Sequence, residues 1–354
     1  MKPAVVPAPR SVIDRLVERR ATEPHIGAWD QPLDNPNIED AQIAHALDRF
    51  AGMPAIGRVE QLYRQKLRLK SWQYMTAVTD DLFIAFVVGT AGFASNGFVY
   101  AAELPSGRVH KRFAITPLMK GTKLAHSSTA AAHLFHARNL SVAIENRGRA
   151  FSAHIDARTE AKDKLRAQLE FDSEPADDHL AVCVPLPDGR WNYTHKFAAF
   201  SVTGHVTIGD RRIDFARDRS FGTMDFSKMF ALRHAVWRWI ALSGKTDSGK
   251  RVGINLVDPT PGAPISENAL WLDGKRHALT NVQVAQDLTS ARADGLELEM
   301  SDVAEVAQRL DLPLVRHRLR HVVGAFRAKF STSSGARENI TRAVGIAEDY
   351  DTWW

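Results

Sequence analysis

The chain has 354 residues, of which 44% are hydrophobic and 25% charged, and its formal net charge is +5. These values are ordinary for a globular protein, and they exclude a disordered chain, a collagen and a coiled coil as the main architecture. Because dedicated nucleic-acid binders concentrate their positive charge on one face, a small excess spread over this length predicts no nucleic-acid partner.

The first 58 residues are expected to form a short helical and irregular N-terminal arm. Segment 11–20 begins with a serine that suits an N-cap and spaces its apolar residues at helical intervals. A second helix is predicted over 38–50, and prolines interrupt the stretch between the two. No apolar run long enough for a secretory signal occurs at the start, and the single cysteine, Cys183, fits a reducing compartment, so a cytoplasmic location is expected.

From about Val59 the pattern becomes that of a β-protein. Asp-Gly and Gly-Asp pairs recur between alternating or apolar runs, and they favour hairpins because such turns need positive φ. The clearest hairpins join 200–208 to 211–215 and 268–272 to 275–279. Segment 82–102 has no charged residue, yet Gly and Asn turn formers interrupt it, so we expect a buried hairpin rather than a membrane span. The predicted turn pairs are Ser106-Gly107, Asp188-Gly189, Gly209-Asp210, Ser248-Gly249, Asp273-Gly274, Asp294-Gly295 and Ser334-Gly335.

Two segments also allow helices. Segment 159–169 suits a surface helix or a strand, and 301–310 suits a short helix that ends before Pro313. Two alternating basic runs are expected to be solvated strand faces, with attraction to an anionic surface as the alternative. These runs are Arg64, Lys66, Arg68 and Lys70, and then Arg316, Arg318 and Arg320.

Successive hairpins without long helices between them predict an all-β chain of two consecutive antiparallel barrels or sandwiches. We place the first barrel at 59–190 and the second at 191–354, because 185–192 contains proline and a turn pair. Cys183, within an apolar run, is expected to be a packed core thiol.

Nucleotide, zinc-protease and serine-hydrolase motifs are absent from the sequence. The pairs His133/His136 and His317/His321 have spacings that a metal can use, but they lack neighbouring Cys or carboxylate ligands. We therefore predict neither a metal nor a cofactor.

The most unusual sequence lies between Trp191 and Trp271. It contains Asn192-Tyr-Thr-His-Lys-Phe197, Phe221-Gly-Thr-Met-Asp-Phe226, Trp237-Arg-Trp239 and Glu267-Asn-Ala-Leu-Trp271, and Gly345-Ile-Ala-Glu-Asp349 follows near the C-terminus. With these motifs, and with the segment from Trp72 through Leu104 in the first half, the chain resembles a bacterial family named domain of unknown function 2804. This family is allied with the lipocalin-like superfamily of carotenoid 1,2-hydratases and AttH homologues. The resemblance implies two lipocalin-like β-barrels and an apolar ligand, because barrels of this size can hold one small molecule.

Asp225 is the first candidate for a catalytic residue. In a mostly apolar setting, burial raises the pKa of a carboxyl group toward the range of a general acid. In a hydratase-like reaction this acid protonates an alkene, and His195 or Glu267 activates water. Tyr193, Trp237, Trp239 and Trp271 are candidates to stabilise the cation with their ring faces. The alternative is that Asp225 accepts hydrogen bonds in a turn and the aromatic rings fill the core.

Arg238 lies between two tryptophans, so the strand register decides whether it or the Trp pair faces the cavity. Asn255 and Asn268 are candidates for contacts with the ligand or for structural hydrogen bonds. The sequence thus predicts a protein that binds an apolar, lipid or isoprenoid-like ligand, and a cofactor-independent hydratase or isomerase. The alternative is a non-catalytic carrier, with its basic strand faces near an anionic membrane surface.

Overall fold

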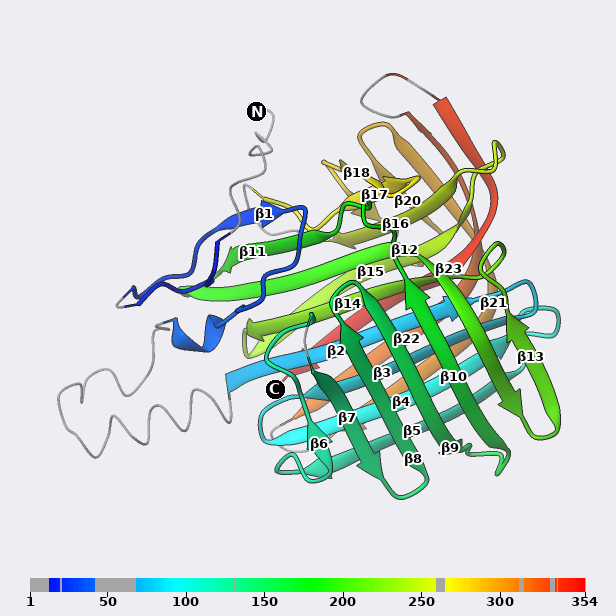
Figure 1. Cartoon of the computed structure of the whole chain (residues 1–354), viewed down its shortest axis with the longest axis horizontal. Coiled ribbons are helices and arrows are strands. Elements are labelled where there is room, and N and C mark those ends of the chain that lie inside the picture. Colours follow the sequence, from blue (N-terminus) through cyan, green and yellow to red (C-terminus); the bar gives the residue numbers. More distant parts are fainter. Residues whose placement is uncertain are drawn as a thin grey trace.

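The computed structural model describes residues 13–19, 21–41, 68–129, 131–258, 265–311, 315–331, 335 and 337–353. Within these ranges regular structure is almost all β-strand, with one short 3-10 helix, η1 (Ile38–Asp40). The strands form two curled antiparallel sheets that pack against each other (Figure 1). The chain therefore has the all-β, lipocalin-like fold that the sequence predicts.

The first sheet contains the strands up to β14. Its main path runs β5-β4-β3-β2-β14-β12-β10-β9-β8-β7-β6, while β11 and β13 pair with β12, and β1 pairs with β11. The bounds are β1 (Gly27–Trp29), β2 (Leu69–Val78), β3 (Leu82–Thr90), β4 (Ala94–Glu103), β5 (Val109–Pro117), β6 (Thr122–Lys123), β7 (Ala132–Ala137), β8 (Leu140–Arg147), β9 (Ala150–Arg158), β10 (Lys164–Asp172), β11 (Leu180–Leu186), β12 (Arg190–Ile208), β13 (Arg211–Phe215) and β14 (Phe221–Phe230).

The second sheet contains the rest of the strands, in the order β18-β17-β16-β15-β23-β22-β21-β20-β19. The bounds are β15 (His234–Lys245), β16 (Arg251–Asp258), β17 (Ala269–Leu272), β18 (Lys275–Ala278), β19 (Gln283–Val284), β20 (Ser290–Ala293), β21 (Leu296–Asp311), β22 (Arg316–Ser331) and β23 (Arg337–Trp353).

The central strands of the first sheet are buried on both faces. Along β2, Gln73 and Met75 point into the hollow of the first sheet, whereas Trp72 and Tyr74 point toward the second sheet. Strands β3 and β14 are buried along nearly their whole length for the same reason. This explains why their sequences are continuous apolar runs rather than alternating ones.

Three apolar layers result from this packing. One fills the hollow of the first sheet, a second fills the hollow of the second sheet, and a third lies between the sheets. The third layer includes Tyr74, Phe98 and Tyr100 from the first sheet and Trp239 and Val323 from the second.

The predicted hairpins are confirmed. β12 pairs with β13, β17 with β18, and the charge-free segment forms the buried hairpin β3–β4. The glycine of each of the seven predicted turn pairs has positive φ, from 59° at Gly209 to 86° at Gly249. Cys183 is buried in the core, and burial raises the pKa of its thiol.

Several expectations need correction. Residues 13–19 form no helix, and of the predicted helix 38–50 the structure describes only η1 and residue 41, with the rest outside the described residues. Segment 301–310 is strand and not helix, because its alternate side chains pack on a sheet. Segment 164–169 is also strand, which is one of the two structures that its sequence allows.

No helix in the described part of the chain is long and apolar enough to span a membrane.

The division between the sheets also differs from the predicted barrel boundary. The turn at Asp188-Gly189 joins β11 to β12 within the first sheet, and the chain enters the second sheet only at His234. A proline and a turn pair mark a hairpin here rather than a linker, because β12 continues the same sheet.

In the first basic run, Lys70 is not on the solvated face that alternation suggests. Arg64 and Lys66 lie outside the described residues, and Lys70 is buried, with its ammonium donating to the Ala91 carbonyl. Burial and the nearby Arg68 and Arg233 lower the pKa of Lys70 to about 7. In the second run Arg316 and Arg318 are exposed, as expected.

The two sheets approach closely at Gly253 of β16. A Cβ atom there would lie 1.8 Å from the carbonyl oxygen of Ala198 in β12. Because backbone rather than a flexible side chain fills this space, only glycine allows the contact.

We expect Gly253→Ala to destabilise the protein by about 1–3 kcal/mol or more, because the sheets must separate to accommodate the methyl group. Ala307→Val adds bulk at an exposed position of β21 and is the control, with a change below about 0.5 kcal/mol. Unfolding in guanidinium chloride measures both. Equal midpoints for wild type and Gly253→Ala would show that the close approach is not required.

Candidate functional site

A cavity of about 480 Å³ lies in the layer between the sheets. Its inner part is lined by β2, β3, β4, β12 and β14 of the first sheet and by β15, β16, β22 and β23 of the second. Its described polar and aromatic wall includes Trp72, Tyr74, Phe98, Asn192, Lys196, Asp225, Ser227, Trp237, Trp239, Glu267, His317, His321, Glu348 and Tyr350. Neither sheet alone forms this cavity.

Aromatic rings form much of the wall. Trp237 stacks on Tyr350 with ring centroids 3.9 Å apart, and Trp72 of the first sheet lies nearly parallel to Trp237 at 6.5 Å. Tyr74 meets Trp239 edge to face at 5.2 Å. The contacts of Trp72 with Trp237 and of Tyr74 with Trp239 join the two sheets, whereas the stack of Trp237 on Tyr350 lies within the second sheet. All of these rings line the cavity and give it apolar surface.

Lys196 of β12 is the centre of a charged cluster at one side of the cavity. Its Nζ lies 3.0 Å from Oδ1 of Asp225 and 3.1 Å from Oε2 of Glu267, and the Lys196 and Asp225 side chains are at most 7% exposed. The ammonium also lies 5.1 Å from the ring centroid of Trp239. Buried charges are stable only when paired, and this cluster meets that condition.

The Asp225 carboxylate accepts three further hydrogen bonds. Trp72 Nε1 donates to Oδ2 at 2.8 Å, and the hydroxyls of Thr194 and Ser227 donate to Oδ1 at 2.9 and 3.0 Å. Burial opposes ionisation, but Lys196 and these donors outweigh it and lower the pKa of Asp225. The Asp225 and Glu267 carboxylates raise the pKa of Lys196 against the effect of its burial.

The expected general acid is therefore corrected. Asp225 is an ionised carboxylate near neutral pH, because a buried ammonium lies beside it, and the apolar neighbours in the sequence do not decide its pKa. Its role in the structure is to hold Lys196 protonated.

A second cluster lies on the β22–β23 side. Glu348 accepts a hydrogen bond from Trp237 Nε1 at 2.6 Å and is hydrogen-bonded to His321 Nε2, while His321 Nδ1 lies 2.9 Å from the Tyr100 hydroxyl. The Tyr74 ring lies beside this cluster, with its centroid 6.0 Å from that of His321. Burial raises the pKa of Tyr74, and the nearby charges of Glu348 and Asp225 act in the same direction.

With histidines neutral, the charged residues that line the cavity are Lys196, Asp225, Glu267 and Glu348, a formal charge of 1 − 3 = −2. A negative, ring-lined cavity disfavours an anionic ligand and favours a neutral or cationic one.

Of the predicted site residues, Asp225, Glu267, Trp237 and Trp239 line the cavity. The Trp pair, not Arg238, faces it, which settles the register. Arg238 lies on the opposite face of β15, with Nε 3.7 Å from Asp349.

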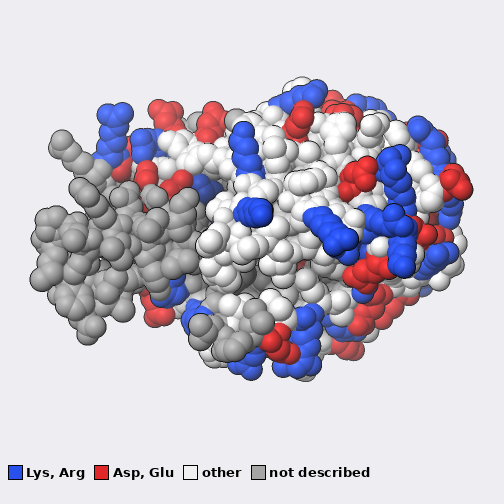
Figure 2. All heavy atoms as spheres, turned by 90° about the horizontal axis from the view of Figure 1, so that it is seen from below, with Lys and Arg blue, Asp and Glu red and all other residues white. Residues whose placement is uncertain are grey.

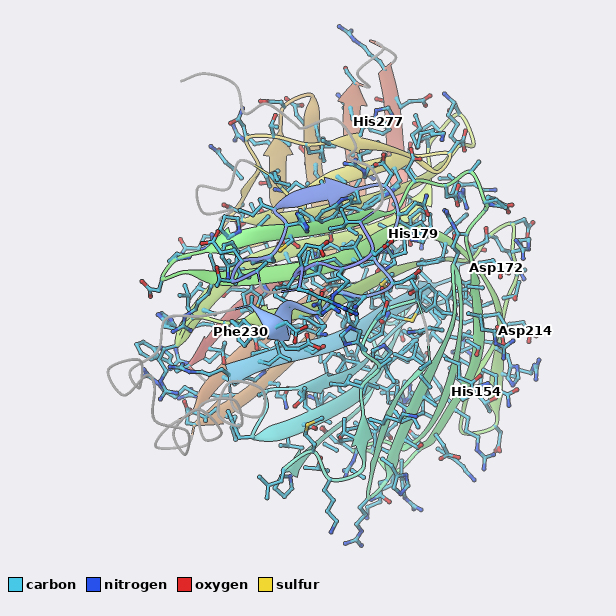
Figure 3. The ribbon with its side chains drawn as sticks, turned by 60° about the vertical axis from the view of Figure 1, so that its left-hand side comes forward. His154, Asp172, His179, Asp214, Phe230 and His277 are labelled. Carbon is cyan, nitrogen blue, oxygen red and sulfur yellow. The ribbon has the colours of Figure 1, made fainter. Side chains whose placement is uncertain are left out.

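Tyr193 and His195 point the other way, into the hollow of the first sheet, because they alternate with Lys196 along β12. The Tyr193 hydroxyl accepts the backbone N–H of Leu33. His195 is hydrogen-bonded to Ser128 and His179, and burial lowers its pKa to about 3. In Figure 3 His179 lies among the packed strands, well inside the outer edge marked by Asp214.

Trp271 and the two asparagines have structural contacts. Trp271 is fully buried and donates to the Asp178 carbonyl, and Asn268 accepts the backbone N–H of Val257. Asn255 positions two residues of the cavity wall. Its side chain accepts a hydrogen bond from Trp239 Nε1 and donates one to the backbone carbonyl of Glu267.

Lys196, Trp72, Tyr74, Tyr100, His321 and Glu348 were missed as site residues. The sequence carried a signal for five of them. Lys196 and Glu348 lie within the motifs that support the family resemblance, and Trp72, Tyr74 and Tyr100 lie within the supporting segment from Trp72 through Leu104. His321 lies outside these motifs. Within the described residues no group of three or more His, Cys, Asp or Glu is arranged to hold a metal.

The model of the family described as "Domain of unknown function (DUF2804)" matches residues 55–354. No curated protein matches the sequence. Among solved structures, a putative AttH from Nitrosomonas europaea has a TM-score of 0.51 at 11% identity, covering 87% of this chain and 97% of that one. Kievitone hydratase from Nectria haematococca has a TM-score of 0.46 at 8% identity, covering 80% and 88%. CghA with Sch210972 has a TM-score of 0.49 at 12% identity, again covering 80% and 88%. The first likeness supports the fold alone.

Replacing Asp225 by asparagine should cost about 1.5–3 kcal/mol of stability near pH 7, because Lys196 loses one of its two buried carboxylates. The folded-state pKa of Asp225 is lowered, so its stabilisation is present above the ordinary carboxyl pKa of about 4 and is lost as the pH falls through the lower, folded-state value.

Urea unfolding of wild type and Asp225→Asn at neutral and acidic pH measures this difference. Asp214→Asn, in an exposed ion pair with Arg212, is the matched control and should change stability by less than about 0.5 kcal/mol. A cost for Asp225→Asn that is the same at neutral pH and well below pH 4 contradicts the assignment.

Proposed function

The chain belongs to the DUF2804 family, and we propose that it binds a neutral, largely apolar small molecule in the cavity between the sheets and catalyses a cofactor-independent proton transfer on it, as a hydratase or isomerase. The observation that carries this proposal is that two hydrogen-bonded titratable clusters open onto one aromatic cavity. Convergence of titratable groups on an apolar pocket is typical of catalytic sites.

The cavity suits a lipid or isoprenoid-like ligand in size and lining. A volume of about 480 Å³ is in the range of pockets that hold drug-sized molecules. The stack of Trp72, Trp237 and Tyr350 offers flat apolar surface, and the excess of carboxylates disfavours a ligand whose buried end is anionic.

Lys196 is the proposed electrophilic group. An ammonium has three N–H donors, and two are directed at Asp225 and Glu267. The third can donate to a carbonyl or hydroxyl oxygen of the ligand and stabilise negative charge that develops there. The raised pKa of Lys196 keeps this donor protonated.

Glu348 is the proposed base. Trp237 and His321 fix its carboxylate at the cavity wall, and His321 is hydrogen-bonded onward to Tyr100. Glu348 takes a proton from water that adds to the ligand, or from a carbon next to a carbonyl, and returns it at another atom. Either reaction leaves the protein unchanged and needs no redox partner.

A non-catalytic carrier is the second candidate. It is favoured by the fact that each carboxylate lining the described cavity already has a protein partner, so that the clusters also stabilise the contact between the sheets. The carrier needs the apolar lining but not the carboxylate of Glu348.

Solvent extraction and mass spectrometry of the purified protein should identify a bound neutral lipid or isoprenoid, which then serves as the substrate in an assay for added water or a shifted double bond. Glu348→Gln keeps the shape of the side chain and should lower turnover by about 10²–10⁴-fold with little change in ligand affinity. Asp349→Asn, on the opposite face of β23 and half-exposed, is the control and should leave both unchanged.

If Glu348→Gln turns over the ligand as fast as wild type, or no turnover of the bound ligand is found, the catalytic proposal fails and the carrier remains. Purified protein that carries no apolar molecule and binds none would refute both candidates.

A further inference from the structure

We propose that the chain docks on an anionic membrane surface through a cationic, apolar-tipped face formed by β5, β6 and β7, which we call the β5–β7 face. This face adjoins the mouth of the cavity. Docking through this face would place the cavity where a neutral membrane lipid can enter. The purpose of docking therefore rests on the proposed apolar ligand, whereas docking itself does not.

The charged residues that this face contributes are all basic. Segment 104–144 contains six Lys and Arg residues and no Asp or Glu. Arg108 and Lys111 are compensated from outside the segment by Asp163 and Glu160. For the other four no carboxylate of the described residues forms an ion pair. These four are Arg112, Lys120, Lys123 and Arg138.

The same four basic residues lie close together. A surface groove of about 560 Å³ between β5 and the end of β7 is lined by Arg112, Lys120 and Arg138 together with Ile115. Lys123 of β6 lies opposite Leu134 of β7, three residues along the chain from Lys120. Figure 2 looks from below at the side where Figure 1 draws β5, β8 and β9, and Lys and Arg side chains lie there on a broad uncharged area.

Large apolar side chains are exposed at the same place. Among the described residues four large hydrophobic side chains are exposed, and three of them belong to this face: Leu118 at 82%, Ile115 at 49% and Leu134 at 38%. Leu118 is at the tip of the β5–β6 turn, beside Met119 and Lys120. An exposed leucine next to lysines that form no ion pair with a described carboxylate is a combination that inserts into a lipid headgroup layer.

This face is continuous with the cavity mouth. Ile115 lines both the groove and the cavity, and the fourth exposed residue, Val236, lines the cavity from the second sheet. The Leu118 backbone N–H donates to the carbonyl of Phe93, which is also in the cavity wall. A bilayer in contact with Leu118 would therefore lie next to the opening.

A bilayer explains both features, whereas a nucleic acid explains only the charge. Polyanion binding uses Lys and Arg contacts with phosphate and gains nothing from an aliphatic tip. Insertion of Leu118 removes an exposed apolar side chain from water, and each lysine adds attraction to anionic headgroups.

The test is co-sedimentation with vesicles of phosphatidylcholine that contain about a third phosphatidylglycerol, using the full chain without added ligand. We expect binding that weakens with salt and is absent for pure phosphatidylcholine vesicles. Leu118→Asn should weaken binding roughly tenfold, because asparagine accepts the left-handed backbone of Leu118 (φ 50°) without the apolar side chain. Lys120→Gln/Lys123→Gln should weaken it roughly 30-fold.

Arg327→Gln/Lys329→Gln removes two exposed positive charges from β22 of the second sheet and is the matched control, with unchanged binding. Circular dichroism and unfolding midpoints check that each variant folds. The proposal is overturned if the anionic vesicles do not bind, if Leu118→Asn binds like wild type, or if the control variant weakens binding as much. Binding to double-stranded DNA in the absence of vesicle binding would also overturn it and assign the charge to a nucleic acid. None of these outcomes bears on turnover of the cavity ligand, so they leave the proposed function to its own assay.

Discussion

The packing of two curled sheets face to face is the constraint on which the rest of the molecule depends. Strands β2, β3, β12 and β14 present one set of alternate residues to the hollow of the first sheet and the other set to the second sheet. Each position must therefore suit one of two interiors, and polar groups are tolerated only where they find partners. The close approach at Gly253 and the aromatic contacts of Trp72 with Trp237 hold the two sheets around the cavity.

The charged groups of the cavity follow from this packing. An ammonium placed between two sheets is costly unless carboxylates accompany it, and Lys196 has one partner from β14 and one from the loop before β17. Removing Lys196 or one of its two carboxylate partners leaves the remaining buried charges without their full compensation. The cluster therefore couples the electrostatics of the site to the stability of the sheet contact, and a change of function at this site would carry a cost in folding.

Much of the fold could be predicted from the sequence, because turns and strand periodicity are local. The glycine turns required positive φ, and each of the seven had it. Helices were wrongly expected where strands are partly charged, as in 301–310, since alternation on a half-exposed sheet resembles a charged helix face. The end of the first sheet was missed because a proline-containing hairpin and a linker have the same local signal.

The site was only half predictable for a different reason. Trp237 and Trp239 could be chosen as a pair because period-2 alternation puts them on one face, and Asp225 and Glu267 stood out as carboxylates near aromatics. Whether His195 or Lys196 faces the cavity depends on the register of β12 in the sheet, and local sequence does not determine that register. His195 was therefore chosen where Lys196 lines the cavity. The pKa of Asp225 depends on Lys196, a contact between strands, so reasoning from apolar neighbours gave the wrong direction.

The central claim is that the ligand site lies between the sheets and not within the hollow of either one. A crystal structure of the protein soaked with the neutral fluorescent probe N-phenyl-1-naphthylamine tests this most directly. The account predicts electron density for the probe against Trp237 and Trp239, on the side of β12 that carries Lys196. Density within the hollow of the first sheet, beside Tyr193 and His195, would contradict it.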